Sequence, residues 1–137
     1  MPASKFAVGQ IFVNTERLDT ERIIAFAQVC GDSSPAHLSD SEAQAVGFPR
    51  ALAHGMLGMA LIGRLIEQSF PQSRLKTFRA RFVGMMFHHD LLQCSATVDK
   101  IDPAANTLQL ALLTTHQERQ TVMTGAATVL IEYDDAR

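Results

Sequence analysis

The first half of the chain carries apolar residues at helical spacing. This spacing predicts three helices, over 18–30, 39–46 and 53–70. The first two end before Gly31 and Gly47, since glycine commonly follows the last residue of a helix. The third is apolar almost all round in its first turns, so other structure must enclose it.

Beyond Pro71 the hydrophobic period changes to two. Alternation of apolar and polar residues there predicts four strands, at 77–83, 91–101, 107–115 and 121–131. A further short strand is predicted at 11–13, before the helices. In the first of them Phe78, Ala80 and Phe82 alternate with polar residues, as in a half-buried strand. A long apolar helix followed by antiparallel strands predicts the α+β class, with the sheet curled around that helix.

Composition narrows the class of protein. The 137 residues correspond to a single domain, 1–137, with no internal repeat or linker, and 47% hydrophobic residues suffice for a core. A net charge of −2 gives no electrostatic case for nucleic acid as a partner. No uncharged apolar run reaches the roughly 18 residues that a membrane span needs.

The location expected from the sequence is the cytoplasm. The first residues lack the layout of a signal peptide. Cys30 and Cys94 stand alone, without the spacing of a metal site or a redox pair. We expect both to be free thiols, buried as small hydrophobic side chains.

Residues 32–37 read Asp-Ser-Ser-Pro-Ala-His, a run of turn formers that predicts a loop between two helices. Asp32 and His37 are five positions apart, which does not place them on one face of a regular helix. In a loop they can converge, and a carboxylate beside an imidazole forms a general acid–base pair. On spacing alone a second interpretation stays open, in which Asp32 and Ser34 only stabilise the turn.

Gly55 is expected in the first turn of the long helix. The first N–H groups of a helix have no internal partner and lie at the positive end of its dipole. A carbonyl oxygen placed there is stabilised as in an oxyanion hole, and glycine lets it approach the backbone closely. For Gly58 and Gly63, close packing of helix and sheet is a sufficient explanation.

Two motifs at a defined separation resemble a known family. GDSSPAH at 31–37, followed after a short helix by AHGM at 53–56, is similar to the MaoC-type (R)-specific enoyl-CoA hydratase and dehydratase family. The resemblance covers roughly 12–129 and includes the pair Arg81-Phe82 after the long helix. It implies the hot-dog fold, an antiparallel sheet wrapped around a long central helix.

The resemblance also implies residue roles. Asp32 and His37 would bind and activate one water, and Gly55 would donate its N–H to the thioester carbonyl. Addition of water would be syn and give the (R)-3-hydroxy product. The resemblance implies a homodimer with sites near the interface, and no cofactor beyond the coenzyme A or phosphopantetheine thioester that the substrate carries.

Further residues are expected around the substrate. Ser34 stands where many relatives carry Asn, and His54 is expected to serve packing or a backbone hydrogen bond. Met56 is a candidate for lining an adaptable acyl pocket. Arg79 and Arg81 belong to a basic cluster that would suit the phosphates of the carrier, although a solvated strand face has the same pattern.

One segment departs from the family's pattern. Relatives usually have a Pro and a Gly-Asp shortly after the Arg-Phe pair, whereas this chain reads GMMFHHDLL at 84–92 and keeps only Asp90. We therefore expect a loop of different shape. His88 and His89 are adjacent and are expected to face opposite ways, so the sequence predicts no metal site.

The sequence thus predicts an enzyme, a hydro-lyase that hydrates 2-enoyl thioesters or dehydrates 3-hydroxyacyl thioesters of coenzyme A or acyl carrier protein. A hot-dog thioesterase is one alternative, which would need a carboxylate or nucleophile aimed at the thioester carbonyl. A non-catalytic hot-dog subunit that holds acyl thioesters is the other. The presence of both Asp32 and His37 favours the hydro-lyase over this subunit.

Overall fold

The computed structural model describes residues 2–118 and 120–132. A short 3-10 helix, η1 (Ala3–Lys5), begins the fold. The four helices are α1 (Thr20–Cys30), α2 (Pro35–Leu38), α3 (Asp40–Ala45) and α4 (Gly55–Ser69). The five strands are β1 (Ile11–Arg17), β2 (Ser73–Phe82), β3 (Leu91–Asp102), β4 (Thr107–His116) and β5 (Thr121–Ile131).

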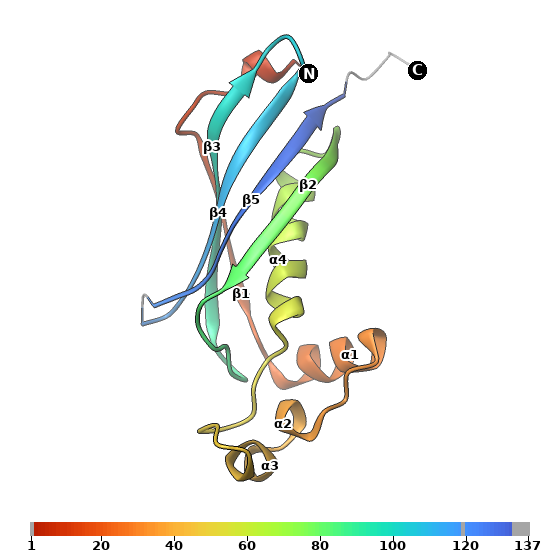
Figure 1. Ribbon diagram of the computed structural model, residues 1–137, viewed down its shortest axis with the longest axis vertical. Coiled ribbons are helices and arrows are strands. Elements are labelled where there is room, and N and C mark those ends of the chain that lie inside the picture. Colours follow the sequence, from red (N-terminus) through yellow and green to blue (C-terminus); the bar gives the residue numbers. More distant parts are fainter. Residues whose placement is uncertain (1, 119, 133–137) are drawn as a thin grey trace.

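The five strands form one antiparallel sheet in the order β1-β3-β4-β5-β2, with β1 and β2 at its edges. Helix α4 lies along one face of this sheet and contacts β1, β2, β3 and β4 (Figure 1). Its buried face joins the inward residues of the strands in one apolar core, where Ile62, Leu110 and Val129 are almost fully buried. The predicted α+β hot-dog architecture is confirmed.

Several boundaries differ from the expectation because strand pairing extends the strands. β1 has seven residues instead of three, since each of them pairs with β3, from Ile11 opposite Thr97 to Arg17 opposite Leu91. β2 begins at Ser73, which pairs with Ile131 of β5. These extra residues lack clear alternation, so their partners define the strand ends.

The segment expected as a loop at 32–37 is helical in part. Pro35 begins the single turn of α2, which suits proline because its missing N–H is not needed in the first turn. His37 therefore lies in a helical turn, and only residues 31–34 connect α1 to α2. The prediction of a loop over 32–37 was wrong at its last three residues, 35–37, which belong to α2.

Helices α1, α2 and α3 gather at one end of the molecule, beyond the N-terminal end of α4 (Figure 1). Asp19 caps α1 by accepting a hydrogen bond from the Arg22 N–H at 2.8 Å, and Gly31 ends it with a φ of 78°. This arrangement brings the segment after α1 to the start of α4. Among the described residues, no helix is both long and apolar enough to cross a membrane.

The two cysteines differ in burial. Cys94 is fully buried in β3, and this burial raises the pKa of its thiol, as expected for an inert core cysteine. Cys30 at the end of α1 is exposed, so the prediction that it is buried was wrong. The end of α1 projects from the fold, and its neighbour Val29 is exposed as well.

Candidate active site

Asp32 and His37 converge as the motif predicts. Asp32 Oδ2 lies 3.4 Å from His37 Nε2, across the turn that joins α1 to α2. The Asp32 carboxylate remains about half exposed, while the His37 side chain retains 18% of its surface. The five-residue spacing permits this because the chain is not helical at 31–34, so the two residues do not belong to one continuous helix.

The hydrogen bonds of His37 define its tautomer. Nδ1 lies 3.0 Å from the main-chain oxygen of Leu52, which only accepts hydrogen bonds, so Nδ1 carries the proton. In the neutral ring the unprotonated nitrogen is then Nε2, and it faces the Asp32 carboxylate. Two acceptor atoms thus converge on one point of the site.

Asp32 is held as a carboxylate by its neighbour Ser34. The Ser34 hydroxyl donates to Asp32 Oδ1 at 2.6 Å, and the Ser34 N–H donates to the same oxygen at 3.2 Å. These bonds lower the pKa of Asp32 below its usual value, the hydroxyl more than the N–H, and the nearby His37 adds a smaller effect. Ser34 therefore acts on Asp32, although the sequence placed it among substrate-binding residues.

His54 connects the two motifs. Its Nε2 donates to the main-chain oxygen of Asp32 at 2.8 Å, and its ring stacks on His37 with centroids 3.9 Å apart. The ring is 4% exposed and also contacts Phe26 edge-on. This confirms the expectation of packing and a backbone hydrogen bond. In the described part of the chain, its Nδ1 is the one buried side-chain nitrogen or oxygen without a hydrogen-bond partner.

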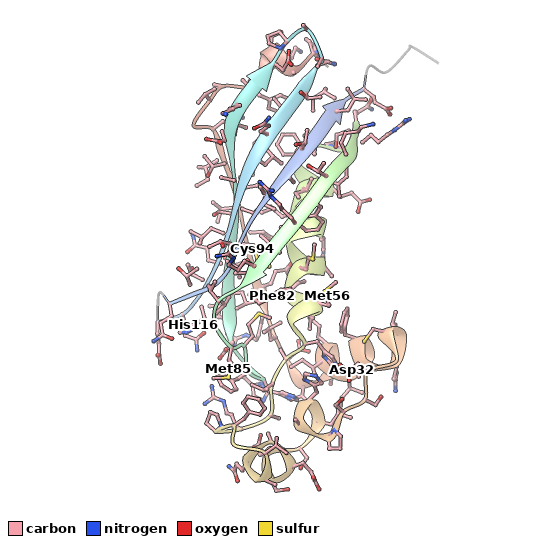
Figure 2. All side chains as sticks on the ribbon, viewed as in Figure 1. Asp32, Met56, Phe82, Met85, Cys94 and His116 are labelled. Carbon is pink, nitrogen blue, oxygen red and sulfur yellow. The ribbon has the colours of Figure 1, made fainter. Side chains whose placement is uncertain are left out.

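Gly55 is the first residue of α4, with His54 as the capping position. The N–H groups of this first turn have no partner within the helix. The ring of Phe82, at the end of β2, lies 3.5 Å from where a Cβ of residue 55 would be. Because the His54 ring stacks on His37, the start of α4 adjoins the acid–base pair (Figure 2).

The other predicted binding residues divide into two groups. Met56 follows Gly55 and is 57% exposed at the same end of α4 (Figure 2). Arg79 and Arg81 are exposed and alternate with Phe78 and Phe82, which face α4, so the two arginines lie on the outer face of the sheet. There they line a shallow hollow of about 400 Å³ with Thr124, Gly125 and Ala126, away from Asp32 and His37.

Ligand-type atoms of Asp32, His37 and His54 lie within 4.8 Å of one another. This is the one group of that kind within residues 2–118 and 120–132. Two of its ring nitrogens, His37 Nδ1 and His54 Nε2, already bind main-chain oxygens. The atoms that remain are the Asp32 carboxylate, His37 Nε2 and His54 Nδ1, and the carboxylate beside His37 Nε2 is an arrangement that suits proton transfer.

Sequence reasoning missed the contribution of the segment between β2 and β3. His88 Nε2 lies 2.6 Å from the main-chain oxygen of His37, and its Nδ1 lies 3.0 Å from Thr20 Oγ1. His89 has a φ of 72°, a conformation that favours glycine, at the position where relatives were expected to carry one. The glycine expected in relatives at the position of His89 is the signal that could have indicated a turn with positive φ here.

Comparison with known proteins identifies a family for this chain. The family described as "MaoC like domain" matches residues 7–120. A mitochondrial 3-hydroxyacyl-[acyl-carrier-protein] dehydratase from Arabidopsis thaliana is 36% identical over 64 residues, 47% of this chain. An (R)-specific enoyl-CoA hydratase from Aeromonas caviae is 34% identical over 71 residues, 52% of this chain. The matches span 39% and 53% of these two relatives.

A solved structure is similar over nearly the whole chain. It is the unliganded R-hydratase PhaJ1 from Pseudomonas aeruginosa, with a TM-score of 0.91 and 27% sequence identity. The similarity covers 97% of this chain and 86% of that one. The structural similarity therefore covers more of this chain than the sequence matches to the two relatives do.

Proposed function

Since this chain belongs to the MaoC-like domain family, we propose that it is a hydro-lyase acting on acyl thioesters. It adds water to a 2-enoyl thioester or removes water from a 3-hydroxyacyl thioester. The observation that carries this proposal is the convergence of Asp32 Oδ2 and His37 Nε2 at 3.4 Å beside the start of α4.

The two acceptor atoms can hold one water between them. Each water O–H donates to one acceptor, which leaves a lone pair of its oxygen directed at the substrate. Because both acceptors approach this water from the same side, hydroxyl and proton are delivered to one face of the double bond. Addition is then syn, and the (R)-3-hydroxy product follows the specificity that the Aeromonas caviae relative is named for.

The proposed hydration step balances as follows. The water oxygen forms a bond to Cβ while one O–H bond breaks, and the π electrons of the C=C bond move toward the carbonyl. The Gly55 N–H stabilises the resulting enolate oxygen, as an oxyanion-hole donor does. The proton released from water reaches Cα through the acid–base pair, which is returned to its starting state.

The substrate supplies the activation that a cofactor would otherwise provide, because a thioester already acidifies its α position. Coenzyme A or phosphopantetheine enters as part of the substrate. We propose that the exposed Met56 contacts the acyl thioester, and that Arg79 and Arg81 contact carrier phosphates from the outer face of the sheet. The cytoplasmic location expected from the sequence stays a prediction.

We also propose a homodimer. β2 is an edge strand, and Phe82 and Val83 at its end are about half exposed, which leaves apolar surface at the site. A second copy covering this edge would enclose the exposed side of Asp32. The same contact would bring the outer-face arginines of one chain closer to the partner's site.

The proposed activity is tested by following loss of the enoyl-thioester absorbance with crotonyl-CoA, a longer 2-enoyl-CoA and the matching acyl-carrier-protein thioesters. Asp32→Asn and His37→Gln should each lower kcat by about 10²–10⁴-fold, the range for loss of a general acid or base. Asp99→Asn at an exposed strand residue and His116→Gln at the partly buried last residue of β4 are matched controls and should keep wild-type rates.

Circular dichroism of each variant checks that the fold is retained. Near-normal rates in both Asp32→Asn and His37→Gln would refute the assignment of the acid–base pair. Release of free thiol without hydration would favour a thioesterase. A wild-type protein that binds acyl thioesters but turns over none of them would favour the non-catalytic subunit.

A further inference from the structure

The turn that carries His37 is too short to hold itself in place. α2 has four residues, and the last carbonyl groups of any helix lack partners within it. The Pro35 oxygen accepts from the Ser39 N–H of the capping residue, whereas the Ala36 oxygen depends on another segment and accepts from the Leu52 N–H. The His37 oxygen accepts from a side chain, the Nε2 of His88, at 2.6 Å.

The roles of the two His88 nitrogens follow from their partners. A main-chain oxygen only accepts, so His88 Nε2 carries the proton that is donated to His37. In the neutral ring Nδ1 is then an acceptor, and the Thr20 hydroxyl at 3.0 Å donates to it. A chain of two hydrogen bonds therefore runs from the start of α1 through His88 to the main chain of His37.

His88 projects from a segment that is itself well anchored. Asp90 is 3% exposed, and its Oδ2 accepts from the Phe87 N–H while its Oδ1 accepts from Gln117. The Arg50 guanidinium lies 3.6 Å from that same Oδ1 and 4.5 Å over the Phe87 ring. A rigid turn thus presents His88, which is the requirement for a side chain that positions another residue.

We infer that His88 is a positioning residue for the acid–base pair. The Thr20 hydroxyl orients the His88 ring, and the ring in turn holds the main chain of His37 in place. This inference rests on the proposed function. His88 touches no reacting atom, so its effect must pass through the placement of His37 Nε2 opposite Asp32. His54 donates to the Asp32 main-chain oxygen in the corresponding way. The main chain of each proposed catalytic residue is thus hydrogen-bonded to one histidine side chain.

The inference predicts a loss of turnover without a loss of binding. His88→Ala should lower kcat about 10-fold or more, the usual cost of removing an outer-shell partner, with KM within about twofold of wild type. His88→Gln should recover most of this loss, because its amide nitrogen reaches the place of Nε2. His88→Asn should recover little, because its amide ends near the place of Nδ1.

Thr20 provides a second and independent test. Thr20→Val removes the hydroxyl at nearly constant shape and should lower kcat less than His88→Ala does. If Thr20 acts through His88, the double variant Thr20→Val/His88→Ala should be no slower than His88→Ala alone. His116→Ala, which removes a histidine at the end of β4, is the control and should keep wild-type kcat.

All rates are measured below the unfolding temperature of every variant, and the ring 1H–15N correlation of His37 is recorded in parallel. This correlation should broaden or shift in His88→Ala and return in His88→Gln, whether or not the protein turns over the thioester tested. An inactive wild type would therefore refute the proposed function alone. Wild-type kcat and an unchanged His37 signal in His88→Ala, or equal effects of Gln and Asn, would overturn the inference about His88.

Discussion

At the residue scale, three histidines share one hydrogen-bonding pattern and differ in what remains free. His37, His54 and His88 each bind a main-chain oxygen through one ring nitrogen. The second nitrogen of His37 faces a carboxylate, that of His88 accepts from a hydroxyl, and that of His54 is buried without a partner. Only the first arrangement leaves a basic atom where a water can reach it.

Gly55 offers a direct test of a backbone donor. Gly55→Pro removes the N–H, yet proline is tolerated at the first position of a helix. The preceding His54 already has the extended conformation that proline requires of its neighbour, with φ −67° and ψ 135°. We expect kcat to fall about 10²–10³-fold, as on loss of one oxyanion donor.

Gly55→Ala is the matched control for that prediction, because it keeps the N–H and its Cβ would meet the Phe82 ring only at ordinary contact distance. It should lose much less activity than Gly55→Pro, with circular dichroism confirming that both are folded. Equal activity of the two variants would show that the N–H makes no contribution.

Ser34 should govern the titration of Asp32. The lowered pKa of Asp32 means that the folded state favours the carboxylate, so the associated stability is present above the unfolded pKa and is lost as the pH falls through the folded one. Ser34→Ala removes the strongest cause of this shift. The pKa of Asp32 should rise toward its unfolded value, so the loss of stability in acid should become smaller and be complete at a higher pH.

A carboxyl-carbon NMR titration of Asp32 measures the change directly. Ser33→Ala, at the exposed neighbouring residue, is the control and should leave the titration curve in place. An Asp32 pKa that is the same in Ser34→Ala and wild type would contradict the role given to the serine hydroxyl.

At the element scale, each long element is stabilised by what packs on it, and the short ones by hydrogen bonds from elsewhere. α4 is buried along Leu61, Ile62 and Leu65 because the sheet curls around it. α2 depends on Leu52 and His88 for its carbonyl groups. His37, the proposed catalytic histidine, therefore lies on a helix that is too short to form alone.

Glycine in the sheet should be less replaceable than glycine in the helix. A Cβ at Gly125 of β5 would collide with the main-chain oxygen of Arg79 on β2, and the backbone there cannot yield easily. Gly125→Ala should lower the free energy of unfolding by about 2 kcal/mol, within the usual cost of overpacking.

In Gly58→Ala the new methyl would meet only the flexible end of Met86, at 2.8 Å, and alanine favours the helix by about 1 kcal/mol. This variant should stay within about 1 kcal/mol of wild type in urea unfolding, since the two effects oppose each other. A larger loss in Gly58→Ala than in Gly125→Ala would contradict the packing described for both positions.

At the scale of the whole molecule, one chain places the acid–base pair and the helix start together but leaves them open on one side. Asp32 is half exposed, and Met56, Phe82 and Met85 present apolar surface at the same end of the molecule (Figure 2). Apolar surface of this kind, next to an edge strand, is typical of a protein that associates.

Sedimentation velocity over a range of protein concentrations tests this association. We expect a species with twice the mass of one chain at micromolar concentration, because burial of the exposed apolar residues favours the pair. The same samples are assayed for hydration, and activity per chain should fall where the dimer dissociates. A stable monomer with full activity would refute the homodimer.

The sequence by itself determined the fold class, the end of α1 at Gly31 and the two motifs at 31–37 and 53–56, because helical period, strand period and turn residues are local properties. Local properties do not report what lies across a turn or on another strand. Only the tertiary structure decided that β1 has seven residues, that Arg79 and Arg81 face away from the site, and that Cys30 is exposed.

The same limit applies to the chemistry of the site. That Asp32 and His37 could form a pair was readable from residue type and spacing, but the protonated nitrogen of His37 is set by Leu52, and its backbone by His88, 51 positions away. Hydrogen bonds between segments remote in sequence depend on how the chain packs, and so they become visible only in three dimensions.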